Sequence, residues 1–161
     1  MNNFLKNLTL KNIVIALAVA IFFMADRYLK TLALSGATVA PIKLIGDILA
    51  FHFTANYYIA FSLPLSGRIL TGLIVLIIVM LIYYICYLAI NKKARQETHR
   101  AEILLLTIIT LGAISNILDR FSYGYVIDYL ELKYFTVFNL ADMMISGGAL
   151  FLIICYLKKN R

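Results

Sequence analysis

The chain has 161 residues, of which 63% are apolar and 14% are charged, and its mean hydropathy is +0.89. Soluble domains have about 45–50% apolar and about 25% charged residues, so this composition excludes a soluble globular domain and a disordered chain. The net charge of +7 does not indicate nucleic-acid binding here, because the excess basic residues flank long apolar segments. The two cysteines, Cys86 and Cys155, lie within such segments, and they indicate no disulfide framework.

Four apolar segments are expected to form transmembrane helices, at residues 12–30, 69–90, 103–120 and 139–157. A spanning helix needs about 20 mostly apolar residues. Only the second segment reaches this length without a charge. The uncharged runs of the other three are shorter, and each is bounded on one side by an aspartate, namely Asp26, Asp119 and Asp142.

Positive charge is distributed unevenly among the segments that flank these spans. The N-terminal tail, residues 91–102 and the C-terminus together carry nine basic and two acidic residues, whereas the rest of the chain carries six of each. Cytoplasmic segments of membrane proteins are enriched in Lys and Arg. The sequence therefore predicts a single all-α membrane domain over residues 1–161, with four transmembrane helices and both termini in the cytoplasm.

The two expected outer segments, residues 31–68 and 121–138, contain sequence that is typical of β-strands. Residues 49–56 are rich in aromatic residues with small polar breaks, which predicts one strand or two. Residues 126–129 form a second short β-like stretch, which follows a Tyr-Gly turn signal. These patterns predict a small extracytoplasmic β-sheet on the outer membrane surface.

Three aspartates lie at a similar depth in the predicted spans. At about 1.5 Å of rise per residue, Asp26, Asp119 and Asp142 each lie about 21–26 Å from the cytoplasmic charge that begins the span, in a hydrocarbon core about 30 Å thick. A carboxylate at this depth costs several kcal/mol unless it is paired, protonated or hydrated. Intramembrane acids at one level therefore indicate a functional site near the outer face.

Two of these acids have a basic residue close by in the sequence. Asp26 and Lys30 are one helical turn apart, and Asp119 directly precedes Arg120. Acids near an interface can pair with such residues or reach water. A purely structural ion pair is therefore an open alternative for Asp26–Lys30 and for Asp119–Arg120.

Asp128 and Asp142 have no basic residue three or four positions away. Two neighbouring carboxyls share a proton, so that one acts as a general base toward water and the other as a general acid toward a carbonyl oxygen. This chemistry needs no metal or cofactor. The isolated His52 and His99 are interpreted as structural residues and not as metal ligands.

Several short motifs occur in order along the chain: Asp26-Arg-Tyr-Leu-Lys30, Asn56-Tyr-Tyr-Ile-Ala60-Phe61-Ser62, Gly112-Ala-Ile-Ser-Asn116-Ile-Leu-Asp119-Arg120, Val126-Ile-Asp128-Tyr129 and Phe138-Asn139-Leu-Ala141-Asp142. In this order and on a chain with four expected spans, they resemble the motifs of signal peptidase II, the family of bacterial lipoprotein signal peptidases. The resemblance covers nearly the whole chain.

The resemblance implies an aspartic endopeptidase of the bacterial inner membrane that cuts a prolipoprotein just before its diacylglyceryl-cysteine. It implies a catalytic dyad of Asp128 and Asp142. It also implies two groups of further site residues: Asn56, Asn116 and Arg120 along the substrate or antibiotic site, and Asp26, Lys30 and Asn139 as supports of its architecture. The expected partners are lipid-modified prolipoproteins and membrane lipid, and the chain is expected to act as a monomer.

Two positions depart from the family pattern, because Tyr58 and Ser115 stand where the family usually has glycine. These departures bear on the shape of the pocket and on inhibitor sensitivity. They also leave open a catalytically inactive homologue that binds lipoprotein signal peptides. A small four-span proton-coupled transporter subunit is a further alternative, which would distribute its acids along a path across the membrane.

Overall fold

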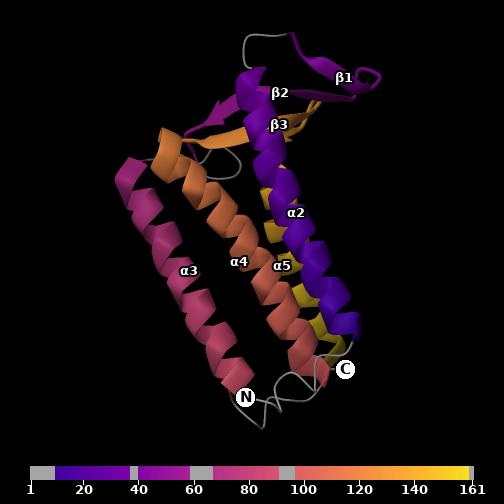
Figure 1. The fold of residues 1–161 in the computed structure, drawn as a ribbon, viewed down its shortest axis with the longest axis vertical. Helices are drawn as coiled ribbons and strands as arrows, with labels where there is room; N and C mark the ends of the chain where they lie inside the picture. The colour runs from indigo at the N-terminus through magenta and orange to yellow at the C-terminus, as the bar shows by residue number, and fades with distance from the viewer. Residues whose placement is uncertain (1–9, 37–39, 59–66, 91–96, 160–161) are drawn as a thin grey trace.

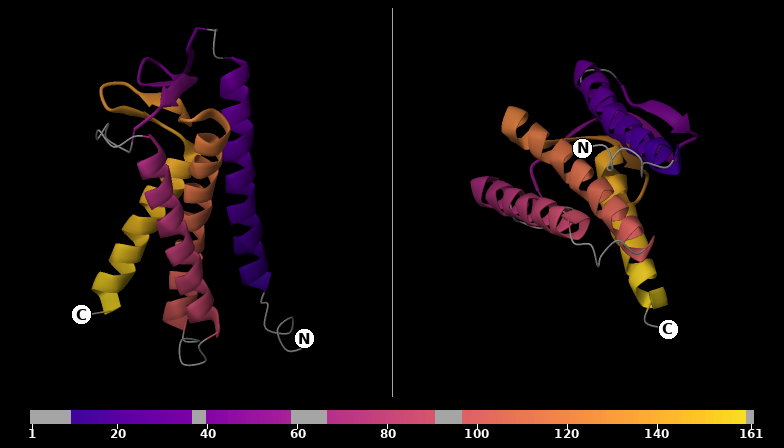
Figure 2. Two further views of the ribbon diagram at one scale, coloured as in Figure 1. Left: turned by 90° about the vertical axis from the view of Figure 1, so that its left-hand side faces the viewer. Right: turned by 60° about the horizontal axis from the view of Figure 1, so that its bottom comes forward.

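In the computed structural model, four long helices lie alongside one another, and a small sheet covers one end of them (Figure 1). The structure describes residues 10–36, 40–58, 67–90 and 97–159. The helices are α2 (Leu10–Ser35), α3 (Gly67–Ile90), α4 (Glu97–Tyr123) and α5 (Leu140–Lys159). The start of α2 and the end of α5 lie at the end of the molecule away from the sheet (Figure 2). The motif residues 59–62 lie outside the described residues, as does most of the basic charge on which the predicted topology rests.

Among the described residues, three helices are long and apolar enough to cross a membrane: Gly67–Ile90, Ala101–Tyr123 and Leu140–Lys158. Helix α2 has a comparable length of 26 residues. It carries the charged residues Asp26, Arg27 and Lys30 in its second half. The crossing of the membrane by α2, and with it the count of four spans, stays a prediction.

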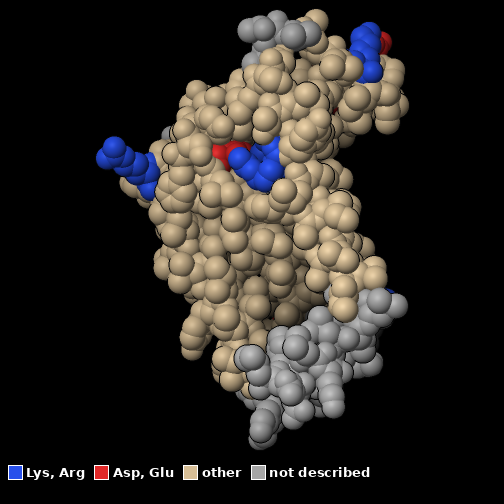
Figure 3. All heavy atoms as spheres, in the orientation of Figure 1, with Lys and Arg blue, Asp and Glu red and all other residues tan. Residues whose placement is uncertain are grey.

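The outer surfaces of the helices are apolar. Large apolar side chains such as Ile69, Tyr83 and Ile90 of α3 are more than two-thirds exposed, and in water they would be unfavourable. On the face shown in Figure 3, most of the visible charged atoms of the described residues lie in the half that carries the sheet. This distribution suits a protein whose helices are surrounded by lipid.

The sheet has four antiparallel strands in the order β1-β2-β3-β4. They are β1 (Ile42–Ile45), β2 (Leu49–Asn56), β3 (Val126–Leu132) and β4 (Thr136–Phe138). The predicted strands at 49–56 and 126–129 are thus confirmed, while β1 and β4 were not expected individually. Gly124, at a φ of +83°, forms the expected turn between α4 and β3, because glycine adopts this left-handed conformation without strain.

Helices α4 and α5 approach each other closely at two glycines. A Cβ atom on Gly112 would lie 2.7 Å from the carbonyl oxygen of Ala141, and one on Gly148 would lie 2.7 Å from Cγ1 of Ile109. The adjacent Gly147 makes no such contact and has open space beside it. The close approach places the polar end of α4 directly beside the start of α5.

The sheet packs against the end of α2 through a small apolar core. Ala33 of α2 and Ile127 and Tyr129 of β3 are fully buried together. The ring of Phe51 on β2 lies 5.5 Å from the ring of Tyr129. This packing holds β3, which carries Asp128, over the ends of α2 and α4.

Candidate active site

Asn139 and Asp142 cap the start of α5 reciprocally. The backbone N–H of Asp142 donates to Oδ1 of Asn139 at 2.8 Å, and the backbone N–H of Asn139 donates to Oδ2 of Asp142 at 3.2 Å. This is the geometry of a capping box, which satisfies two N–H groups that a helix N-terminus leaves unpaired. The local sequence therefore fixes the Asp142 carboxyl at the first turn of the helix.

The same asparagine connects Asp142 to Asp128. Nδ2 of Asn139 donates to Oδ1 of Asp128 at 2.7 Å, and Nδ2 of Asn56 donates to Oδ2 of Asp128 at 2.9 Å. Thr54 of β2 is paired with Asp128 of β3. Asn56, two residues further along β2, lies on the same face of the sheet and reaches Asp128 diagonally. The structure thus places the two predicted catalytic aspartates on either side of one asparagine.

Neither carboxyl of this pair forms an ion pair with any side chain in the described part of the protein. Asp128 is only 1% exposed. Burial and the negative charge of Asp142 raise the pKa of Asp128 to about 7, against the two amide hydrogen bonds and the positive charge of Lys30, which lower it. Asp128 therefore binds and releases a proton near neutral pH.

Asp26 and Asp119, in contrast, belong to a buried cluster with two cations. Nζ of Lys30 lies 3.1 Å from Oδ2 of Asp26 and 2.7 Å from Oδ2 of Asp119, and Nη1 of Arg27 lies 2.5 Å from Oδ1 of Asp119. The ion pair of Asp26 with Lys30, which the sequence left as an open alternative, is present. Two negative and two positive charges balance in this cluster, as burial of charge requires.

The alternative of an ion pair between Asp119 and Arg120, which the sequence left open, is not present in the structure, where Asp119 pairs with Arg27 and Lys30. Successive residues of a helix point about 100° apart and do not face each other. Arg120 instead donates to the backbone carbonyls of Tyr57 at 3.3 Å and Tyr58 at 2.7 Å. It thereby ties α4 to the chain that follows β2, while Arg27 of α2 pairs with Asp119.

Asn116 links the charged cluster to the aspartate pair. Its Oδ1 accepts a hydrogen bond from Nζ of Lys30 at 2.8 Å, and its Nδ2 donates to Oδ1 of Asp142 at 2.8 Å. Nδ2 of Asn139 also lies 3.2 Å from Oδ1 of Asn116. All the predicted site residues are thus joined in one network, Arg120 through the backbone beside Asn56.

Ser115 and Tyr129 were not assigned a role from the sequence, yet both hold Asp26. The Ser115 hydroxyl donates to Oδ2 of Asp26 at 2.6 Å, and the Tyr129 hydroxyl donates to Oδ1 at 3.0 Å. Burial and the neighbouring Asp26 raise the pKa of the Tyr129 hydroxyl, so it stays a donor. A signal existed for Ser115, because it lies one turn before Asp119 on the same helix face.

Both departures from the family pattern now have a structural description. Ser115 is fully buried and uses its hydroxyl inside the charged cluster. Tyr58 contributes backbone atoms: its carbonyl accepts from Arg120, and its N–H donates to Oδ1 of Asn56 at 3.0 Å. The Tyr58 side chain is 48% exposed, so its bulk does not separate these polar groups.

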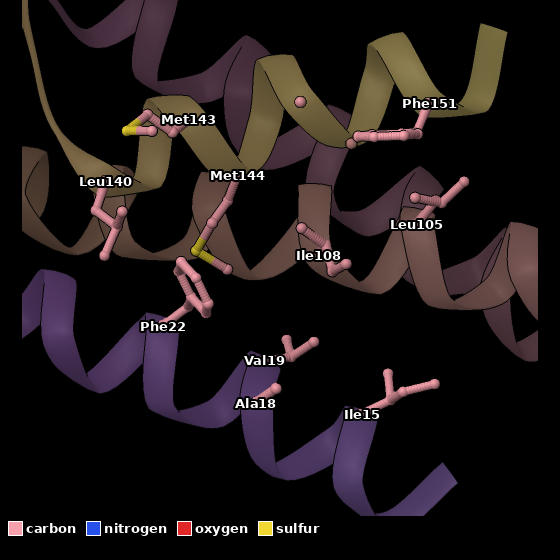
Figure 4. A pocket seen from close by; sticks show the side chains of 12 residues that line it. Ile15, Ala18, Val19, Phe22, Leu105, Ile108, Leu140, Met143, Met144 and Phe151 are labelled. Carbon is pink, nitrogen blue, oxygen red and sulfur yellow. The ribbon is translucent and has the colours of Figure 1, made fainter. Parts of the chain in front are cut away.

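A separate pocket of about 400 Å³ lies between α2, α4 and α5 (Figure 4). It is lined by Ile15, Ala18, Val19, Phe22, Leu105, Ile108, Leu140, Met143, Met144, Gly147, Gly148 and Phe151. Asp142 is two positions after Leu140, about 200° around the helix at 100° per residue. The pocket therefore lies on the face of α5 away from Asp142 and forms no part of the polar site.

Comparison with known proteins decides the family. The family described as signal peptidase (SPase) II matches residues 18–158 of the chain. The chain belongs to the signal peptidase II family. Membership and the apolar helices together make it a multi-pass membrane protein.

Individual signal peptidase II relatives match most of the chain. A lipoprotein signal peptidase of Caldicellulosiruptor bescii is 33% identical over 138 residues, which cover 86% of this chain and 87% of the relative. One of Clostridium tetani is 30% identical over 141 residues, covering 84% and 86%. The fold also matches a bacterial membrane enzyme solved by the in meso method at 2.3 Å resolution, with a TM-score of 0.76 and 20% identity over 91% of this chain and 89% of that one.

Proposed function

We propose that this protein is an aspartic endopeptidase that removes signal peptides from lipid-modified prolipoproteins, cutting just before the diacylglyceryl-cysteine. The relatives named lipoprotein signal peptidase support the substrate class. The observation that carries the chemistry is the bridge through Asn139, which donates to Asp128 at 2.7 Å and to Asp142 at 3.2 Å. No cation neutralises either carboxyl among the described residues.

In the proposed reaction, one ionised carboxylate of the pair takes a proton from a water molecule as the water oxygen attacks the scissile carbonyl carbon. The protonated carboxyl donates its proton to the carbonyl oxygen. The tetrahedral intermediate then collapses: the carbon–nitrogen bond breaks, the leaving amine receives a proton from the first carboxyl, and the second recovers its own. The pair ends in its starting state.

The other predicted site residues have supporting roles in this proposal. Asn56, Asn116 and Asn139 orient the two carboxyls, while Asp26 and Lys30 hold α2 against the site. Arg120 fixes the backbone at Tyr57 and Tyr58, beside the position expected for the substrate.

We further propose the topology that the charge distribution predicts: one membrane domain of four spans, both termini in the cytoplasm and the site near the outer face of the inner membrane. A substrate held by acyl chains then presents its scissile bond at the depth of the pair, because each buried CH₂ adds about 0.8 kcal/mol to membrane binding. One chain contains the whole polar network, which supports action as a monomer.

The test is cleavage of a lipidated precursor by the purified protein in detergent. We expect the wild type to cut it, and to cut the same precursor without the diacylglyceryl group far more slowly. An Asp128→Asn, Asp142→Asn double variant prepared identically controls for contaminating proteases. Binding of the precursor without cleavage would identify an inactive homologue, and proton flux in vesicles without cleavage would identify a transporter.

A further inference from the structure

The two carboxyls of the pair receive hydrogen bonds of different kinds. Asp142 accepts one from Nδ2 of Asn116 at 2.8 Å and one from the backbone N–H of Asn139 at 3.2 Å. Asp128 accepts two from side-chain amides, those of Asn56 and Asn139. Each carboxyl oxygen thus accepts one hydrogen bond. The two carboxyls differ in the groups that orient and polarise the donors.

The amide of Asn116 is bonded to a positively charged group, the ammonium of Lys30. Nζ of Lys30 donates to Oδ1 of Asn116 at 2.8 Å, so the amide can only direct its NH₂ group toward Asp142. The amide lies between a cation and a carboxylate, and hydrogen bonds in such a chain polarise and strengthen one another. Lys30, which is 1% exposed, therefore acts on Asp142 without touching it.

The second donor to Asp142 belongs to a helix N-terminus. Asp142 lies in the first turn of α5, and the dipole of a helix gives its N-terminus a partial positive charge that favours a carboxylate. The bond from Asn139 is part of the cap itself. These two contacts favour the charged form of Asp142, against its burial and against the negative charge of Asp26 of α2.

In the described part of the chain, the amides that donate to Asp128 are not bonded to a cation. Oδ1 of Asn56 accepts from the backbone N–H of Tyr58, and Oδ1 of Asn139 accepts from that of Asp142. Both amides are thus oriented by neutral groups, and Asp128 lies on a strand. Burial and Asp142 raise the pKa of Asp128 to about 7, which accords with a carboxyl that carries a proton below neutral pH.

The charged residues that act on Asp128 come from three elements. Asp142 of α5 repels its negative form, and Lys30 of α2 attracts it. Arg120 of α4 also carries a positive charge close to both carboxyls, but its guanidinium donates to the carbonyls of Tyr57 and Tyr58. None of them forms an ion pair with Asp128.

We propose that Lys30 and Asn116 are positioning residues that make the pair asymmetric, with Asp142 as the ionised base and Asp128 as the carrier of the proton. This inference rests on the proposed peptidase function. Asp142 takes the proton of the attacking water, and Asp128 gives its proton to the scissile carbonyl oxygen. In the second half, Asp142 protonates the leaving amine and Asp128 regains its proton from the tetrahedral hydroxyl, so no further reactant is needed.

A matched pair of variants tests the assignment through the pH dependence of kcat/KM. Asn116→Leu removes the donor to Asp142, and Asn56→Leu removes a donor to Asp128; each also removes one acceptor elsewhere. Loss of a hydrogen bond to a carboxylate raises the pH at which it ionises, by about one unit. The acid limb of the profile reports the base, and the alkaline limb reports the acid.

We expect Asn116→Leu to move only the acid limb and Asn56→Leu only the alkaline limb, both upward. Lys30→Arg should keep the acid limb nearer to that of the wild type than Asn116→Leu does. The opposite assignment of limbs would overturn the proposal. So would equal movement of both limbs, or of neither.

A second measurement needs no activity and therefore separates this inference from the proposed function. The infrared C=O stretch of a protonated carboxyl in the resting protein, at mildly acidic pH, should disappear in Asp128→Asn and persist in Asp142→Asn. Disappearance only in Asp142→Asn would reverse the assignment, and persistence in both would refute it. A wild type that shows this pattern but cleaves no lipidated precursor would refute the peptidase and leave the asymmetry intact.

Discussion

The charged cluster and the aspartate pair are neighbouring regions that solve the burial of carboxylates in opposite ways. In the cluster, Asp26 and Asp119 contact Lys30 and Arg27 directly. In the pair, the partners of both carboxyls are neutral amides and a backbone N–H. Asn116 connects the two regions, because it bonds to Lys30 on one side and to Asp142 on the other. Only in the aspartate pair do the carboxyls have no direct cationic partner among the described residues that would hold them in the charged form.

In the proposed function, this difference assigns stability to the charged cluster and proton transfer to the aspartate pair. A carboxylate that forms an ion pair with a cation of another helix contributes to holding the helices together. Hydrogen bonds from amides hold the Asp128 carboxyl in position, while its pKa of about 7 lets it exchange a proton near neutral pH. Variants of the two regions should therefore fail in different assays.

The largest expected effect is on cleavage by variants of the pair. Asp128→Asn and Asp142→Asn should each lower kcat/KM by about 10³-fold or more, since each removes a group that transfers a proton. The double variant should be hardly worse than either single one, because residues that act as a unit fail together. The measurement is cleavage of a lipidated precursor by monodisperse protein.

Glu131→Gln is the matched control for these variants. It makes the same chemical change on the same strand, three residues after Asp128, at a side chain that is 44% exposed. It should retain normal cleavage. Substantial cleavage by either Asp128→Asn or Asp142→Asn would contradict the assignment of proton transfer to the aspartate pair.

The second prediction concerns the stability of the charged cluster. Lys30→Met leaves Asp26 and Asp119 without their shared cation, and breaking a buried ion pair costs about 3–5 kcal/mol. We expect denaturation in detergent to show a loss of this size. Lys43→Met, in the exposed pair with Asp47, should cost less than about 1 kcal/mol.

Adding Asp26→Asn to Lys30→Met should recover part of the lost stability, because one of the two stranded charges is removed. Equal stability of the wild type and Lys30→Met would show that the cluster does not hold the helices together. Failure of the second substitution to recover any stability would mean that side-chain volume, and not charge, sets the cost.

The third prediction is a pH dependence of stability that comes from the pair. Because the pKa of Asp128 is raised to about 7 in the folded protein, the folded state binds a proton that the unfolded chain has released above about pH 4. Stability should therefore fall as pH rises from about 4 to about 7, by about 2–4 kcal/mol in total.

Denaturation of wild type and Asp128→Asn over this pH range isolates that contribution. The variant cannot titrate at this position, so the difference between the two curves should follow the titration of Asp128. Asn56 and Asn139 donate to different oxygens of Asp128, and an amide replaces one of these oxygens by an NH₂ group. The variant therefore also leaves one donor without an acceptor, at about 1–3 kcal/mol. Parallel curves would show that Asp128 titrates alike in both states.

The smallest expected effect belongs to Ser115, the buried hydroxyl of the cluster. Ser115→Ala removes the donor to Asp26 and should cost about 1–3 kcal/mol, with little change in kcat/KM. Ser35→Ala, at an exposed hydroxyl that bonds only to Leu32 among the described residues, should be neutral. A loss of activity larger than the loss of stability would place Ser115 in the catalytic region instead.

Much of the framework was predictable because it depends on local rules. Hydropathy located the apolar helices, and the alternating residues of 49–56 correspond to strand β2. The spacing of Asn139 and Asp142 is that of a helix cap, and the structure contains the cap. These features depend on residues a few positions apart, whose geometry is the same in any fold.

The equal depth of the aspartates also followed from the sequence, because helical rise is constant and apolar length is readable. That argument grouped Asp26, Asp119 and Asp142 without separating them by role. Asp128 joined them only through its lack of a basic neighbour and through the family resemblance.

The choice of partners was decided by the tertiary structure alone. Asp119 pairs with Arg27 of another helix and not with the adjacent Arg120, and Asp26 is held by Ser115 and by Tyr129. These contacts depend on which helix faces meet and on how β3 lies across them. The sequence determined which residues reach the end of the helices that carries the sheet. Packing decided which carboxylates received a cation and which received only neutral donors. Partners about 90 to 100 residues apart are selected by the crossing of elements and not by spacing along the chain.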